Sequence, residues 1–180
     1  IDERFVDEHT LTAIFTAGTV ATTVLYQSTS KEILLTLAIT FGTCAYHFIM
    51  RLLVGSIVNS ILHNKVDYCK RWFQVSESEK KIYEKLGVKK WKNKMPTYRP
   101  DWFDPRLHSW KEIAQIMCQS EVGHEIIAVL SFLPVFAGIK FGAYPVFIIT
   151  SIVSAGMDLI FVIMQRYNRQ RIMRILAAKK

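Results

Sequence analysis

The sequence lacks most of the short motifs that identify soluble enzymes. Its 180 residues include only three cysteines, none in a C-x-x-C spacing, so neither a disulfide framework nor a zinc site is predicted. It contains no glycine-rich phosphate loop and no G-x-S-x-G nucleophile turn. Charged residues are also missing from long stretches, although they make up 21% of the chain. The charges are therefore segregated, and the alternation of polar and apolar segments is the main guide to function.

Four apolar segments are candidates for membrane-spanning helices: residues 10–28, 33–62, 121–139 and 143–164. A helix rises about 1.5 Å per residue, so roughly 20 apolar residues cross the hydrocarbon core of a bilayer. The third segment reaches that length only if its helix begins near Glu121, with the polar first turn at the interface. The sequence predicts an all-α polytopic membrane protein, a single membrane domain over residues 1–180. Its two helical hairpins, about four transmembrane helices, flank a cytoplasmic interfacial segment at residues 63–112.

The distribution of basic residues predicts the orientation in the membrane. Thirteen of the 23 Lys and Arg residues lie within residues 63–111, and six more lie within residues 166–180. The expected hairpin tips carry only Lys31 and Lys140. Because Lys and Arg beside short loops stay on the cytoplasmic side, the pattern predicts a multi-pass protein of the cell membrane with both termini and the central segment in the cytoplasm.

The central segment combines lysines with aromatic residues. A net charge of +8 is compatible with nucleic-acid binding, but the chain has no nucleic-acid fold signature and its basic residues lie beside the spans, so we expect anionic lipid headgroups as partners and no nucleic acid. Tryptophan favours the headgroup region of a bilayer. The segment is thus expected to lie on the inner leaflet, or alternatively to pack as a small cytoplasmic subdomain around its tryptophans. These are Trp72, Trp91, Trp102 and Trp110.

Polar and ionisable residues also occur inside the expected spans, where they are costly and point to function. His47 and Arg51 share a face of the second span, the third begins with Glu121 and His124, and the fourth contains Asp158. At about 1.5 Å per residue, all five fall in the inner-leaflet half of the membrane. We predict that they meet in one polar cluster. The alternative is structural, with Arg51 reaching a lipid phosphate or pairing with Asp158.

The spacing Glu121-x-x-His124 places a carboxylate one turn before an imidazole on the same helix face. That arrangement suits a carboxylate that orients a histidine general base. A similar spacing occurs in di-iron bundles, but those need it twice together with two further Glu residues. Here it occurs once, so we predict no metal site and no bound cofactor.

Three stretches resemble a known family. Tyr83 to Pro96 (YEKLGVKKWKNKMP), Glu121-x-x-His124, and the pentapeptide QRYNR at residues 165–169 are similar to the glycosyl-4,4'-diaponeurosporenoate acyltransferases. Those small membrane enzymes attach a fatty acyl chain to the sugar of a glycosylated carotenoid in bacterial pigment synthesis. The resemblance extends from about Tyr83 to Arg171. It departs from the family pattern at Gln170, where proline is usual, and at Glu125, where tryptophan is common.

The resemblance implies an integral membrane acyltransferase that acts at the inner leaflet on a hydroxyl of a lipid or glycolipid. Acyl transfer to a hydroxyl needs a base for that proton and a hydrogen-bond donor for the carbonyl oxyanion. We expect His124, oriented by Glu121, to be the base, with His47 as the alternative. The donor would be acyl-CoA, acyl carrier protein or another lipid. The expected substrate-binding residues are Arg51, Arg166 and Arg169 for an anionic group, Asn168 for the oxyanion or a sugar hydroxyl, and Asp158, Gln165, Trp91 and Lys92 around them.

A second interpretation is not enzymatic. The chain would be a lipid-binding or assembly subunit of a membrane lipid-synthesis complex, and its polar faces would form a buried packing network. A transporter or channel of 180 residues would require an oligomer, which the sequence leaves possible.

Overall fold

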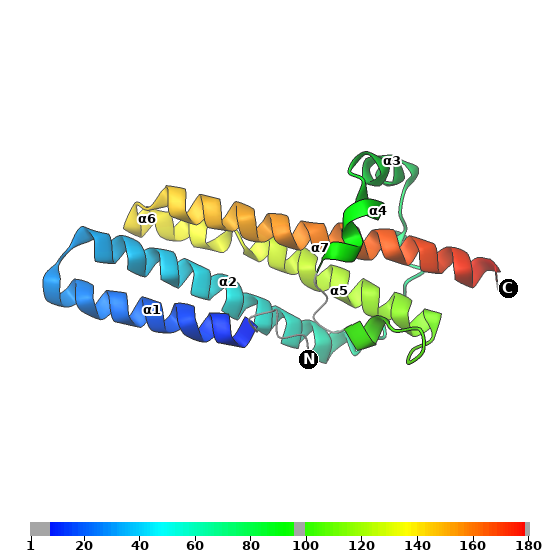
Figure 1. Ribbon diagram of the computed structural model, residues 1–180, viewed down its shortest axis with the longest axis horizontal. Coiled ribbons are helices and arrows are strands. Elements are labelled where there is room, and N and C mark those ends of the chain that lie inside the picture. The colour runs from blue at the N-terminus through cyan, green and yellow to red at the C-terminus, as the bar shows by residue number, and fades with distance from the viewer. Residues whose placement is uncertain (1–7, 96–99, 179–180) are drawn as a thin grey trace. The chain divides into compact units, whose positions relative to one another are not determined.

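The computed structural model describes residues 8–95 and 100–178, and these residues form helices and connecting turns without a β-strand. The predicted all-α class is therefore confirmed for the described part of the chain. The longer elements are α1 (Glu8–Thr29), α2 (Glu32–Leu62), α3 (Glu77–Lys85), α4 (Val88–Trp91), α5 (Trp110–Leu130), α6 (Gly138–Phe141) and α7 (Tyr144–Ala178) (Figure 1). Short 3₁₀ turns are η1 (Arg71–Phe73), η2 (Lys92–Lys94), η3 (Pro100–Phe103) and η4 (Leu133–Ala137).

Three helical stretches among the described residues are long and apolar enough to cross a membrane: Glu32–Leu62, Trp110–Phe141 and Tyr144–Ala178. The sequence predicted about four. The remaining segment forms a helix, α1, but its many threonines make it less apolar than the other three. Threonine hydroxyls of α1 donate to carbonyl oxygens one turn earlier, as Thr22 does to Gly18 at 2.7 Å, so they are satisfied within the helix.

The boundaries of two helices differ from those expected. The fourth expected span ended at residue 164, whereas α7 continues to Ala178. The third was expected to begin near Glu121, whereas the helix that contains it, α5, begins at Trp110. This helix ends at Leu130, and a 3₁₀ turn with Pro134 in its first turn follows, because proline lacks the N–H that a continuing α-helix needs.

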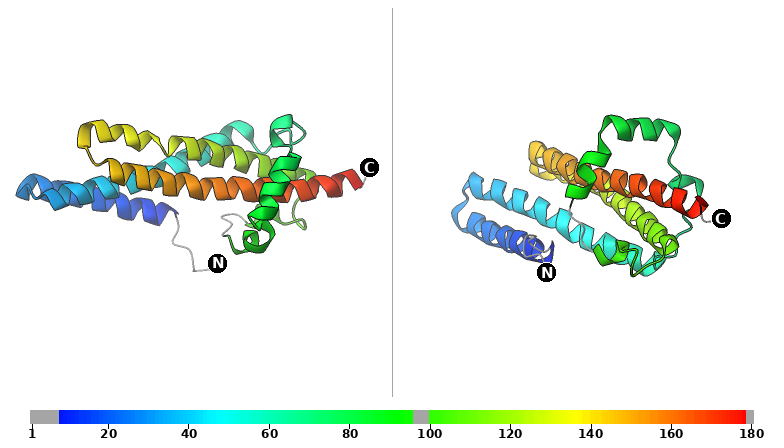
Figure 2. Two further views of the ribbon diagram at one scale, coloured as in Figure 1. Left: turned by 90° about the horizontal axis from the view of Figure 1, so that it is seen from above. Right: turned by 45° about the vertical axis from the view of Figure 1, so that its right-hand side comes forward.

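Contacts between Cα atoms divide the chain into two compact units, and the first comprises the described residues of Ile1–Ser56 with Ile126–Met157. In this unit α1 lies antiparallel beside α2 (Figures 1 and 2). Phe15 stacks on Phe48 with ring centroids 5.6 Å apart and contacts Phe41 at 6.3 Å. Gly18 allows this approach, since a Cβ there would lie 3.1 Å from the Phe41 ring. Aromatic packing thus joins the first hairpin.

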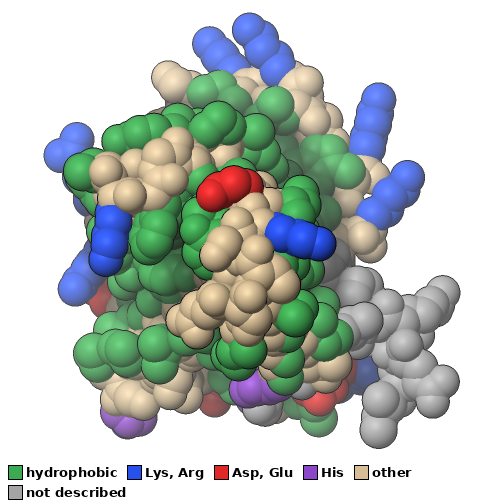
Figure 3. Space-filling view, turned by 90° about the vertical axis from the view of Figure 1, so that its left-hand side faces the viewer, with side chains coloured by type: hydrophobic (Ala, Val, Ile, Leu, Met, Phe, Trp, Pro, Cys, Tyr) green, Lys and Arg blue, Asp and Glu red, His purple; other side chains and the backbone are tan. Residues whose placement is uncertain are grey.

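Small polar contacts join other parts of the first unit. The Tyr46 hydroxyl donates to the carbonyl oxygen of Leu130 at 2.9 Å, and the hydroxyls of Ser131 and Ser154 are 3.0 Å apart. Such bonds between helices are typical of packing in lipid. Large apolar side chains are exposed outside these contacts, for example Ile139 and Val153. Figure 3 looks onto the end with the helix turns, where hydrophobic side chains are also exposed. Exposed apolar surface of this kind is expected where lipid replaces water.

The second unit comprises the described residues of Ile57–Glu125 and Asp158–Lys180. Its core holds Ile113, Ala114 and Met117 of α5 against Ile172 of α7, and the partly buried residues packed on it are Tyr68, Phe103, Trp110 and Leu176. Trp110 of the central segment packs on this core, whereas Trp72 is 66% exposed. Both placements of the central segment, on the inner leaflet or as a small cytoplasmic subdomain, stay predictions.

The turn between α6 and α7 gives a prediction about stability. A Cβ at Gly138 would lie 2.5 Å from the Tyr144 ring, so Gly138→Ala forces the turn to shift and should cost about 1–3 kcal/mol. Gly156→Ala is the matched control in the same unit, because a Cβ at Gly156 meets nothing within 4 Å. Thermal unfolding in detergent should show a lower midpoint for the first variant and an unchanged or higher one for the second. Equal midpoints would contradict the packing described.

Candidate functional site

A histidine and an aspartate form a hydrogen-bonded pair between α5 and α7 in the second unit. His124 Nδ1 lies 2.8 Å from Asp158 Oδ1, and the imidazole stacks on the Phe161 ring with centroids 4.9 Å apart. The Asp158 carboxyl is fully buried, whereas 23% of the His124 side chain is exposed. A carboxylate that accepts from Nδ1–H holds the proton on that nitrogen and leaves the lone pair of Nε2 as a base. The arrangement can therefore accept a proton from a bound hydroxyl.

Glu121 was expected to orient the imidazole of His124, but its carboxylate is bound by other residues. Its buried side chain accepts from two arginines of α7: Arg166 Nη1 at 2.5 Å from one oxygen and Arg169 Nη1 on the other. The partner that holds His124 is Asp158, so the prediction that Glu121 orients the base is corrected. The physical reason lies in α7, which brings two guanidinium groups to Glu121 and a carboxylate to His124. The spacing on α5 alone did not contain that information.

The two arginines also hold the segment before α3. Arg166 donates to the carbonyl oxygens of Trp72 and Gln74 at 3.0 and 3.1 Å. Arg169 donates to the carbonyl oxygen of Phe73 at 2.8 Å and lies over the Phe73 ring. Both guanidinium groups therefore bind acceptors of the chain itself. Their expected role, binding an anionic substrate group, stays a prediction.

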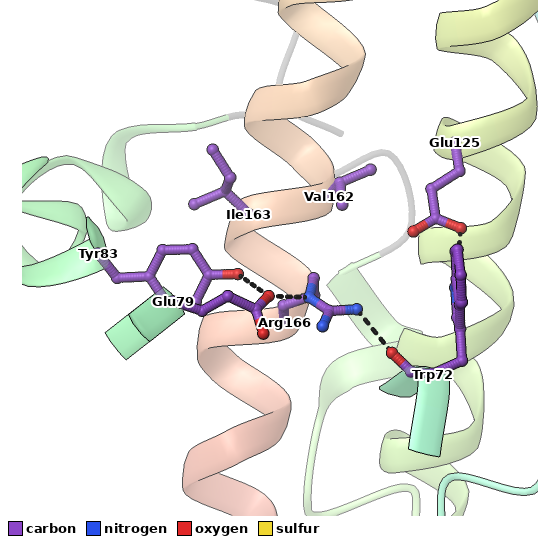
Figure 4. Close-up of a pocket in the computed structure, with 7 residues that line it drawn as sticks. All are labelled: Trp72, Glu79, Tyr83, Glu125, Val162, Ile163 and Arg166. Atoms are coloured by element: carbon purple, nitrogen blue, oxygen red, sulfur yellow. Dashed lines mark hydrogen bonds and ion pairs between the residues drawn. The ribbon is translucent and has the colours of Figure 1, made fainter. Parts of the chain in front are cut away.

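A pocket of about 370 Å³ lies beside these contacts (Figure 4). In one wall of the pocket the Trp72 indole N–H donates to Glu125 Oε2 at 3.1 Å (Figure 4). His124 and Asp158 do not line the pocket, but Glu125 follows His124 in α5 and Val162 lies one turn after Asp158 in α7. Its lining residues are Trp72, Glu79, Tyr83, Glu125, Val162, Ile163 and Arg166.

Burial and charge set the ionisation of two groups in the pocket wall. Burial, together with the nearby charge of Glu79, raises the pKa of Tyr83 to about 12. The Tyr83 hydroxyl, which donates to Glu79 Oε1 at 3.1 Å, therefore keeps its proton at neutral pH. Burial works to raise the pKa of Glu79, but bonds from the Ser76 N–H and from Arg166 outweigh it, so the pKa lies below its ordinary value. The wall thus presents a neutral phenol and an ionised carboxylate.

The capping box at the start of α3 explains how Glu79 reaches this wall. The Ser76 hydroxyl accepts from the Glu79 N–H, and the Glu79 carboxylate accepts from the Ser76 N–H at 2.8 Å. This reciprocal pair is a frequent helix start and is visible in the sequence as Ser-x-x-Glu. The sequence analysis did not assign Glu79, Tyr83 or Trp72 to the site. The capping pattern could have located Glu79, but not its second contact with Arg166.

Other residues of the expected site have individual positions. Gln165 donates to the Ser120 hydroxyl at 3.2 Å, and Asn168 is partly buried on α7. The Trp91 indole donates to the carbonyl oxygen of Leu86 at 3.1 Å. The Lys92 ammonium lies 5.8 Å from the centre of the Tyr167 ring, and burial, with the charge of Arg171, lowers the pKa of Lys92.

Two of the expected residues belong to the first unit. His47 is buried, and the centroids of the His47 and Tyr46 rings lie 5.4 Å apart in an edge-to-face arrangement. Arg51 Nη2 lies 3.5 Å from the carbonyl oxygen of Ser154. The second unit brings together Glu121, His124 and Asp158 on α5 and α7. That all five meet in one cluster stays a prediction. No group of three His, Cys, Asp or Glu side chains that could hold a metal ion occurs among the described residues.

Comparison with known proteins gives a family match for the chain. No curated protein and no solved structure matches the chain. A family model described as glycosyl-4,4'-diaponeurosporenoate acyltransferase matches residues 69–178, which is more than half of the sequence. The match includes the His124–Asp158 pair, both arginines of α7 and every residue that lines the pocket. The chain therefore belongs to the glycosyl-4,4'-diaponeurosporenoate acyltransferase family.

Proposed function

We propose that the protein is an integral membrane acyltransferase that transfers a fatty acyl group to a hydroxyl of a lipid or glycolipid at the cytoplasmic leaflet. The observation that carries the proposal is the buried Asp158 carboxylate on Nδ1 of His124, on the same two helices that supply Glu125 and Val162 to the pocket. Family membership supports acyl transfer, and the family description supports a glycosylated acceptor. Three long apolar helices support a membrane location.

His124 is the general base in this proposal. Its Nε2 removes the proton of the acceptor hydroxyl while that oxygen attacks the carbonyl carbon of the acyl donor. Asp158 stabilises the imidazolium that forms. When the tetrahedral intermediate collapses, the bond to the donor breaks, and the leaving thiol or alcohol takes the proton from His124. The donor is a thioester of coenzyme A or acyl carrier protein, or an acyl ester of another lipid.

The pocket holds the acceptor headgroup. Glu79 and Glu125 are acceptors for sugar hydroxyls, and the exposed Trp72 indole offers a flat apolar surface for a sugar ring. Arg166 also lines the pocket, but its charge is matched by Glu79 and Glu121. A donor that carries phosphate groups fits these carboxylates poorly. The neutral, hydroxyl-rich partner is therefore assigned to the pocket.

The membrane arrangement that goes with this mechanism has four spans, with α1 as the first. Both termini and residues 63–112 then lie in the cytoplasm, and the turns near Lys31 and Lys140 lie outside. The distribution of Lys and Arg supports this orientation.

A non-enzymatic role in a lipid-synthesis complex is the second candidate. The contacts of Glu121 with Arg166 and Arg169 favour it, because they form the buried packing network that this role would require. The two candidate functions differ at His124, because the acyltransferase requires it as a general base and the non-enzymatic role does not.

The first prediction from this proposal concerns His124 as the general base. His124→Ala should lower product formation by about 10²- to 10⁴-fold without loss of folding, because the proton of the acceptor hydroxyl has no acceptor. Asp158→Asn should also lower turnover, since an amide does not stabilise the imidazolium. Lipid analysis by mass spectrometry of cells that express each variant would measure the O-acylated product. His108→Ala serves as the control, since His108 lies on the loop before α5.

The result for His47→Ala decides between the two histidines. If that variant loses the product while His124→Ala keeps wild-type turnover, the base is His47. If both variants keep full activity, the histidine mechanism is wrong and the non-enzymatic role is favoured.

The second prediction separates structure from chemistry at Glu121. Glu121→Gln leaves the buried Arg169 guanidinium without its counter-charge, removes one of the two carboxylates bound by Arg166, and should lower the free energy of unfolding by about 3–5 kcal/mol. Glu84→Gln on the exposed side of α3 is the control and should change stability little. Unfolding curves in mixed detergent micelles measure both. A Glu121→Gln protein as stable as wild type but inactive would instead give Glu121 a direct role in the reaction.

The third prediction tests the membrane topology by labelling Cys69. Cys69 is exposed and lies in the central segment, whereas Cys118 is buried. A membrane-impermeant maleimide should leave Cys69 unlabelled in intact cells and label it after the membrane is permeabilised. Lys140→Cys in a Cys69→Ser background should be labelled in intact cells, because Lys140 is exposed at the opposite turn. Labelling of Cys69 in intact cells would reverse the proposed orientation.

A further inference from the structure

The exposed surface of α3 and α4 carries lysines, and two large apolar residues of α3 and its C-cap are exposed near them. Ile82 and Leu86 are each 51% exposed, although both are large and hydrophobic. We call this group the α3–α4 surface. Its members are Lys81, Ile82, Lys85, Leu86, Lys89 and Lys90, and all six are exposed.

The fold presents this surface outward for local reasons. On the inner side of α3, Tyr83 is buried, and Glu79 bonds to Arg166 of α7. Lys81 and Lys85 each follow an inner residue by two positions, a rotation of about 200°, so they point away from α7. The exposed Ile82 and Leu86 lie on the flank of the helix between the two sides. Gly87 ends α3 with a left-handed φ of 61°, and the Trp91 indole bonds back to the carbonyl oxygen of Leu86. The turn into α4 is thus held in place.

The balance of charge on this side is positive. Of the three acids of α3, Glu79 faces inward to Arg166, and Glu77 is paired with Lys80. Glu84 remains as an exposed acid beside the four lysines of the surface. The surface therefore complements an anionic partner, and its apolar members require that the partner also be partly apolar.

The direction of α3 indicates which partner that is. Within the second unit α3 crosses α7 and does not run alongside it (Figures 1 and 2). A helix that crosses a membrane-spanning helix lies in the plane of the bilayer, where lysines meet headgroup phosphates and leucine or isoleucine reaches the acyl boundary. We propose that the α3–α4 surface docks on the anionic phospholipid headgroups of the membrane that holds the protein. This docking does not depend on acyl transfer.

Docking of this surface on lipid would also set the level of the pocket relative to the membrane. Tyr83 and Glu79 on the inner side of α3 line the pocket, so a bilayer held against the outer side keeps the pocket at headgroup level. A lipid acceptor then reaches the pocket without leaving the leaflet. Each lysine beside an anionic surface strengthens the association about fivefold.

The test uses the full chain in nanodiscs. Cys44, Cys69 and Cys118 are replaced by serine, and Ser78→Cys, on the same exposed side of α3, carries a bimane label. Quenching by a lipid with a nitroxide on its headgroup is compared in discs of phosphatidylcholine and in discs with 30% phosphatidylglycerol. We expect at least twofold stronger quenching in the anionic discs. Equal quenching in both kinds of disc would overturn the proposal.

Charge-reversal variants identify the surface. The triple variant Lys81→Glu, Lys85→Glu and Lys89→Glu should lose the added quenching, and the same three positions changed to arginine should keep it. Lys65→Glu, an exposed lysine outside the surface, is the single-charge control and should have no effect. If the reversed and arginine variants quench alike, the lysines do not bind the headgroups and the proposal fails.

An acidic protein is the competing partner. Poly-glutamate is therefore added to the neutral discs. If it shields the bimane label from iodide while phosphatidylglycerol gives no added quenching, the surface binds an acidic protein and the membrane proposal is overturned.

Discussion

The second unit depends on one buried carboxylate. Glu121 lies fully inside the protein and accepts from both Arg166 and Arg169, so its charge is matched without water. Removal of an ion pair from water is costly, and such a group persists only where every partner is satisfied. The two guanidinium groups meet this condition by binding the carbonyl oxygens of the segment before α3. A single charge on α5 thus determines where a segment almost fifty residues earlier in the chain must lie.

The position of that segment creates the pocket. Trp72 lies against Glu125 in one wall of the pocket. The helix that follows, α3, places Glu79 and Tyr83 in the opposite wall. Arg166 belongs to both groups, since it binds Glu121 on one side and Glu79 on the other. The structural ion pairs and the pocket therefore share a residue. The acidic and aromatic lining is a consequence of the way in which the buried charge is satisfied.

The His124–Asp158 pair lies next to this network and uses the same two helices. α7 presents a carboxylate to His124 and, two turns later, guanidinium groups to Glu121. The contact with the imidazole that was expected of Glu121 is made by Asp158, which was expected among the substrate-binding residues. Asp158 contacts the imidazole and can stabilise its protonated form, whereas Glu121 stabilises the fold around it. The docking of α3 on lipid would place this chemistry at the level of the headgroups.

The helical class and three long apolar helices could be predicted from the sequence, because they follow from the length of the apolar runs. The Ser76–Glu79 capping box and the glycine at residue 87 fix the start and end of α3 in the same local way. Glu121, His124 and Asp158 were predicted to be important because charges in apolar helices are costly, and Arg166 and Arg169 because the pentapeptide QRYNR resembles the acyltransferase family. Which of these residues contact one another became clear only in the folded structure. Helical periodicity gives the face that a side chain occupies, but the register between α5 and α7 is set by packing, and that register gave Asp158 to His124 and the arginines to Glu121.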